Sequence, residues 1–139
     1  MIIGINILRV NGFLFILLAF SGQLSGPFPF SAGIGDIIVG LLALPLVFAE
    51  PRLGRSDARL VPWNVFGLFD LVTAVALGLT SGNGSPLQLI HAGVGSAAIT
   101  EFPWSFIPLF LVPCYLVGHV IVFVHMRATV RQMERAVAA

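Results

Sequence analysis

Four long apolar segments constrain what this chain can fold into more than any other feature. They cover residues 2–20, 32–49, 61–80 and 103–126. Each is close to the roughly 20 residues that a helix needs to cross the hydrocarbon core of a bilayer. Charged residues make up only 9% of the chain, against about 25% in an ordinary soluble domain. We therefore predict a single transmembrane domain over residues 1–139, an all-α bundle of four spanning helices.

A fifth apolar stretch, residues 87–100, is not predicted to span the membrane. Its sequence, LQLIHAGVGSAAIT, is shorter than a spanning helix and is interrupted by glycine. Such a segment suits an interfacial or re-entrant position before the last helix.

The arginines predict the orientation of the bundle. Four spans place two basic clusters on one face of the membrane, whereas a fifth span would separate them. The clusters are Arg52, Arg55 and Arg59 in one connection and Arg127, Arg131 and Arg135 in the tail 127–139. The connections 21–31 and 81–102 contain no Lys or Arg. By the positive-inside rule, both termini are expected in the cytoplasm, with the bundle in the inner (plasma) membrane and the basic tail at its lipid headgroups.

Three ionisable residues interrupt the apolar segments at similar depths. Counted from the cytoplasmic face at 1.5 Å per residue, Asp70 is roughly 13 Å deep, and His119 and Arg9 are each roughly 10 Å deep. A lone charge at this depth costs about 2.5–3.5 kcal/mol, so such groups normally find partners inside the bundle. We predict that Arg9 pairs with Asp70, and that His119 or Asn64 completes the hydrogen bonding.

Two interpretations of this polar layer remain open. It is either a buried ion pair that sets the helix register, or a proton relay or binding site for an ion or small solute. Tyr115 lies one helical turn from His119 and would line the same cavity. The predicted binding residues are Asp70, His119, Arg9, Asn64 and Tyr115.

A second polar group is expected toward the outer side. Asp36 falls in the first turns of the second segment, where the helix dipole favours an acid. His91 and Glu101 belong to the same side. These residue types bind divalent metals, but their spacing matches no metal motif, and we predict no metal site.

The two intramembrane aspartates share a local pattern. Asp36 and Asp70 each follow a glycine by three residues and precede a small residue by four. These positions share one helix face, and small residues allow helices to approach closely. An inverted repeat of the kind found in transporters would give the same pattern, and both explanations stay open.

Composition and motifs narrow the function classes. The net charge of +1 offers no basic surface for nucleic acid, and the single Cys114 excludes an intrachain disulfide. No hydrolase, metalloprotease or nucleotide-binding motif is present, so no catalytic residue or cofactor is assigned. We predict a transporter or channel for an ion or small solute. A membrane-embedded enzyme or cofactor- or lipid-binding protein, and an assembly subunit of a larger complex, remain alternatives. Because four helices enclose little volume, a homo-oligomer is expected.

Several motifs resemble a group of uncharacterised small bacterial multi-pass membrane proteins. They are W-N-x-x-G-x-x-D at 63–70, G-x-G-D at 33–36, R-x-x-G-x-x-F at 9–15 and the proline-containing run at 106–119. The resemblance implies no activity. It does imply that Arg9, Asp36, Asn64, Asp70 and His119 belong together as one set.

Overall fold

The computed structural model describes residues 2–49 and 59–137. Within these ranges the chain is helical apart from its connections, with no strand. Four helical stretches are long and apolar enough to cross a membrane: Ile3–Phe20, Phe28–Ala49, Leu60–Thr80 and Ile107–Ala128. The prediction of four helices of membrane-spanning length is therefore confirmed, as expected for a multi-pass membrane protein. The arginines at 52 and 55 lie outside the described residues.

The first helical stretch has an unusual period of three. It consists of η1 (Ile3–Gly12), a 3₁₀ helix, followed by α1 (Phe13–Phe20). A 3₁₀ helix has three residues per turn, so every third residue lies on the same face. The buried residues follow this spacing: Ile3, Asn6, Arg9, Gly12, Phe15 and Leu18. A single narrow face therefore carries both polar residues into the bundle.

Glycines bring η1 into backbone contact with α2 (Phe28–Ala49). A Cβ atom on Gly33 would lie 2.7 Å from the carbonyl oxygen of Gly12, and one on Gly40 would lie 2.8 Å from the amide nitrogen of Val10. Only glycine allows so close an approach, as is common where membrane helices pack. This contact places Arg9 directly against α2.

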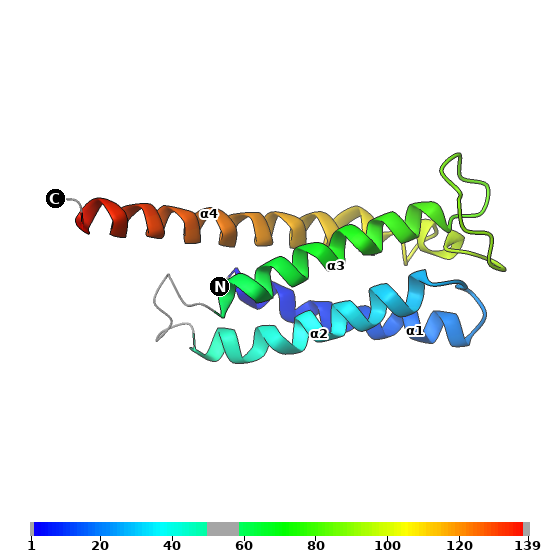
Figure 1. Ribbon diagram of the computed structural model, residues 1–139. Helices are drawn as coiled ribbons and strands as arrows, with labels where there is room; N and C mark the ends of the chain where they lie inside the picture. The colour runs from blue at the N-terminus through cyan, green and yellow to red at the C-terminus, as the bar shows by residue number, and fades with distance from the viewer. Residues whose placement is uncertain (1, 50–58, 138–139) are drawn as a thin grey trace.

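The third and fourth spans complete the bundle. Helix α3 (Leu60–Thr80) lies between α2 and α4 (Val112–Val137), and α4 extends beyond the other helices at its C-terminal end (Figure 1). A π-helical segment, η3 (Ile107–Leu111), leads into α4. Pro113 near the start of α4 has no N–H to donate to the preceding turn, which accounts for the change in helix type there.

Two connections form a cap at one end of the bundle, which we call the loop end. Ser25 donates its backbone N–H to the carbonyl of Gly95 at 3.0 Å, and Gly95 donates its own N–H to Ser25 Oγ at 2.8 Å. Ser96 Oγ donates to the carbonyl of Gly78 at 2.6 Å. The segment 87–100 thus folds as turns and the short helix η2 (Ala97–Thr100), and it is no fifth spanning helix.

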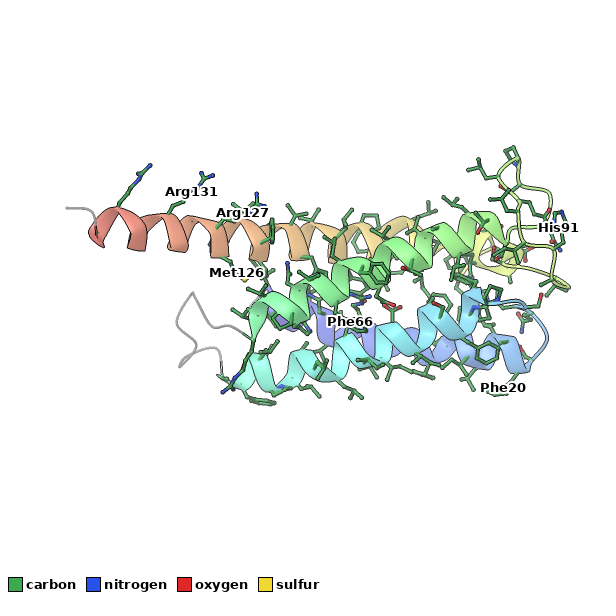
Figure 2. The ribbon with its side chains drawn as sticks, viewed as in Figure 1. Phe20, Phe66, His91, Met126, Arg127 and Arg131 are labelled. Carbon is green, nitrogen blue, oxygen red and sulfur yellow. The ribbon has the colours of Figure 1, made fainter. Side chains whose placement is uncertain are left out.

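The opposite end, where η1 begins and α4 ends, is called the terminal end (Figure 1). Arg127 and Arg131 point away from the bundle there, as Figure 2 shows, and Arg135 is also exposed. These three arginines are therefore exposed on a helical extension of α4.

Two apolar clusters divide the interior into layers. One cluster, at the terminal end, contains Ile3, Val39, Ala43, Leu46, Leu60, Trp63 and Val122. The other, at the loop end, contains Phe15, Leu18, Leu24, Phe28, Ala32 and Ile99. The buried ionisable residues Arg9, Asp36, Asp70 and His119 lie between these two clusters and form the polar layer.

Candidate functional site

Arg9 is the centre of the polar layer, and its side chain is 0% exposed. Its Nε donates to Asp36 Oδ1 on α2 at 2.7 Å, and its Nη2 donates to Asp70 Oδ2 on α3. One guanidinium therefore bridges two carboxylates that come from two neighbouring helices. Hydrogen bonds of this kind, between two charged groups, are among the strongest in proteins.

The Nη1 nitrogen of Arg9 fixes the protonation state of His119. Arg9 Nη1 lies 3.1 Å from the carbonyl oxygen of Gly67, to which it donates, and 3.2 Å from His119 Nε2. A guanidinium has no acceptor, so His119 Nε2 accepts and the ring is neutral with its proton on Nδ1. Nδ1 then donates to Asn64 Oδ1 at 2.8 Å, and Asn64 Nδ2 donates to the carbonyl of His119 at 3.2 Å.

Two glycines on α2 and α3 make room for this arrangement. A Cβ atom on Gly35 would overlap the carboxylate of Asp70, and one on Gly67 would lie 2.7 Å from His119 Nε2. Real side chains do not approach so closely. The glycines are therefore a steric requirement of the site.

Aromatic rings border the cluster on two sides. The guanidinium carbon of Arg9 lies 5.7 Å from the centroid of the Tyr115 ring, within the range of a cation–π interaction. The rings of Trp63 and His119 are 5.1 Å apart, and Trp63 Nε1 donates to the carbonyl of Val39 at 3.1 Å. These contacts hold both Arg9 and His119 in place.

Two buried polar side chains beside the cluster have no hydrogen-bond partner among the described residues. Asn6 is 0% exposed, yet neither its Oδ1 nor its Nδ2 is bonded. The hydroxyl of Tyr115, a residue 3% exposed, is also unbonded. Buried polar groups are usually satisfied, because an unmet donor or acceptor costs about 1–3 kcal/mol. The amide of Asn6 and the hydroxyl of Tyr115 are therefore free to form further hydrogen bonds beside the polar layer.

The charges of the cluster do not balance. Arg9 contributes one positive charge, His119 is neutral, and Asp36 and Asp70 contribute one negative charge each when ionised. The layer then carries a net charge of −1 in the middle of an apolar bundle. One further proton or cation is needed to neutralise it.

The predicted contact of Arg9, Asp70, His119 and Asn64 is found in the structure, with Tyr115 beside it. The outer group is not. Asp36 bonds to Arg9, whereas His91 and Glu101 are exposed in the connection 81–106 (Figure 2 labels His91).

Placing Asp36 with His91 and Glu101 was wrong because α2 begins at Phe28 rather than at residue 32. Asp36 is therefore about 12 Å along the helix, deeper than its first turns. No group of three or more His, Cys, Asp or Glu side chains is gathered as in a metal site within residues 2–49 and 59–137.

The sequence analysis did not identify Asn6 and Gly35 as parts of the site. The position of Asn6 could have been predicted from its spacing. It precedes Arg9 by three residues and lies on the same face of η1, which repeats every third residue. Gly35 is the second glycine of the G-x-G-D motif at 33–36, but its role depends on where the neighbouring helix places Asp70.

The chain was compared with known protein families, curated proteins and solved structures. Residues 1–127 match the model of a family described as "Domain of unknown function (DUF8737)". No match was found among curated proteins, and none among solved structures. The match covers all four candidate spans almost completely and includes every residue of the polar layer.

Proposed function

We propose, for a chain that belongs to the DUF8737 family of unknown function, that it is a small transporter or channel whose polar layer binds a proton or a small cation. The observation that carries the proposal is the sharing of one guanidinium by Asp36 and Asp70. The single positive charge of Arg9 neutralises only one of these two carboxylates, although its side chain donates hydrogen bonds to both.

The apolar surroundings make the unbalanced charge costly. Desolvated charges are stable in proteins only when they are paired, and ionisable groups inside a membrane bundle usually mark ion or proton pathways. A proton or cation held between Asp36 and Asp70 restores neutrality. Its release to one side and rebinding from the other is the elementary step of transport.

Polar groups on both sides of the layer support a path through it. Toward the loop end, Asp36 forms part of the wall of a cavity. Toward the terminal end, the unbonded amide of Asn6 lies one 3₁₀ turn from Arg9 along η1. An unbonded amide beside a purely structural ion pair would only lower stability. In an ion path, the same amide would bind the ion or a water molecule as it passes.

The expected orientation and assembly complete the proposal. The terminal end faces the cytoplasm of a cell whose inner membrane holds the protein, because the arginines of the tail lie there. Copies of the chain associate as a homo-oligomer. A detergent-corrected mass equal to one chain, in a preparation that still transports, would contradict this association.

Proton or cation binding is tested by infrared spectroscopy of the protein in lipid nanodiscs. The carbonyl stretch of a protonated carboxyl group reports whether Asp36 or Asp70 carries a proton at neutral pH. We expect this band in the wild type and its loss or shift in Asp36→Asn and Asp70→Asn. If a small cation replaces the proton, the carboxylate bands instead change on exchanging sodium, potassium and a large organic cation.

Glu101→Gln provides the control, because Glu101 is an exposed carboxylate outside the layer. Two ionised aspartates whose bands respond neither to pH nor to the cation would refute the proposal. Flux is then measured in liposomes with an internal pH or cation dye, and Asp70→Asn is expected to abolish it while helix content is unchanged.

A further inference from the structure

One cavity of about 440 Å³ occupies the loop-end half of the bundle. Its walls come from all four spans and the cap, and most of the lining side chains are apolar, among them Phe28, Leu71 and Ile99. Asp36 is the only charged residue of its lining. The volume lies within the roughly 300–1,000 Å³ of small-molecule sites.

The carboxylate of Asp36 is available to this cavity. Its Oδ1 accepts the hydrogen bond from Arg9, and its side chain retains 12% exposure. Its second oxygen, Oδ2, accepts no hydrogen bond from the residues that the structure describes. One acceptor at the inner end of an apolar cavity is thus free to bind a ligand.

The mouth of the cavity lies on the side of the bundle. Val75, Leu79 and Leu109 line the cavity and are also exposed on the outer surface, between α3 and η3. In a membrane this surface faces lipid tails, because the helices that carry it are of spanning length. A ligand with an apolar body can therefore enter this cavity directly from within the bilayer.

We infer that this cavity binds an amphipathic cation, a small apolar molecule with one ammonium group that contacts Asp36. The apolar walls accept its body, and the net negative charge of the layer attracts its head. An anionic amphiphile is repelled, and a neutral one leaves the charge unbalanced. The inference rests on the proposed function in one respect, since the ligand replaces the proton or small cation as the balancing charge.

The test compares three probes of equal chain length: octylammonium, octanol and octanoate. Binding is measured by isothermal titration calorimetry of the protein in nanodiscs, with empty nanodiscs as the reference for partition into lipid. We expect octylammonium to bind one per chain, and octanol to bind at least about tenfold more weakly, the factor set by a hydrogen bond to a charged group. Octanoate is expected to show no binding beyond partition.

Three variants locate the site. Asp36→Asn is expected to weaken the binding of octylammonium by about tenfold or more and to leave the binding of octanol unchanged. Ala74→Phe fills the cavity from α3, and it should abolish binding of both probes. Val72→Phe is the matched control on the same helix, because Val72 is exposed and is not part of the lining.

Equal affinity for octylammonium and octanol would overturn the inference and indicate an apolar site for lipid tails. Binding of octylammonium that survives Ala74→Phe would also overturn it. Failure of the proposed ion site is a separate result. The infrared bands are recorded without any probe, so their insensitivity to pH and cations, combined with Asp36-dependent binding of octylammonium, would leave the ligand site standing and remove the ion-transport proposal.

Discussion

The carboxylate of Asp70 lies directly against the backbone of Gly35, and no Cβ atom fits between them. This contact lets α3 present Asp70 to Arg9 beside Asp36. The two acids meet because position 35 has no side chain.

Gly35→Ala is expected to displace Asp70 and to destabilise the protein by about 1–3 kcal/mol, the usual cost of overpacking. The free energy of unfolding is measured in mixed detergent micelles. Gly118→Ala is the control, because its Cβ would lie 3.7 Å from Ile2 Cγ2 and from Ile5 Cγ2, an ordinary contact. Equal stability of the two variants would show that the approach of Asp70 to α2 is not as close as described.

Arg9→Met is expected to destabilise the bundle by about 3–5 kcal/mol, because it leaves two buried carboxylates without a cation. Adding Asp36→Asn and Asp70→Asn to Arg9→Met should restore much of this loss, since the neutral amides need no counter-charge. The measurement is the same unfolding equilibrium. If the triple variant is no more stable than Arg9→Met, then Arg9 does not stabilise the bundle by compensating the charges of Asp36 and Asp70.

The two buried asparagines are expected to respond in opposite directions to leucine. Asn6→Leu removes an unsatisfied amide and should raise the free energy of unfolding by about 1 kcal/mol. Asn64→Leu removes the hydrogen-bond acceptor of His119 Nδ1 and should lower the free energy of unfolding by about 1–3 kcal/mol. Each variant serves as the control for the other. Under the proposed function, Asn6→Leu also slows flux in liposomes despite its higher stability.

Nitrogen NMR of histidine-labelled protein in bilayers is expected to show His119 with a proton on Nδ1 and a bare Nε2. The reason is that Arg9 donates to Nε2 and Asn64 Oδ1 accepts from Nδ1. Asn64→Ala should broaden or shift the Nδ1 signal. Exposed His91 gives the reference signal of a ring outside the layer. A doubly protonated His119 in the wild type would contradict the assignment and the charge count built on it.

Reporter fusions test the expected orientation. A periplasmic-type alkaline phosphatase joined after residue 139 is expected to be inactive, and the same enzyme inserted in the connection 81–106 is expected to be active. The four spans place these two points on opposite faces, and the arginines of the tail assign the cytoplasmic one. Activity at both points would contradict a bundle of four spans.

The sequence by itself determined the four helices and the meeting of Arg9, Asp70 and His119. Segment length sets the number of spans, and depth along each helix sets which polar groups share a layer. A charged group in an apolar layer needs a partner, so three ionisable residues at one depth were bound to converge.

The depth count placed Asp36 elsewhere, and only the family resemblance grouped it with this layer. The tertiary structure decided that Asp36 bonds to Arg9, that Gly35 admits Asp70 and that a cavity ends at Asp36. Depth says nothing about rotation around a helix axis, and an error of four residues in where α2 begins moves a side chain by about 6 Å. The rotation of η1 came from its 3₁₀ geometry, and that of α2 from glycine contacts between backbones. Contacts of this kind exist only between helices that are already packed, and for that reason no single segment encodes them.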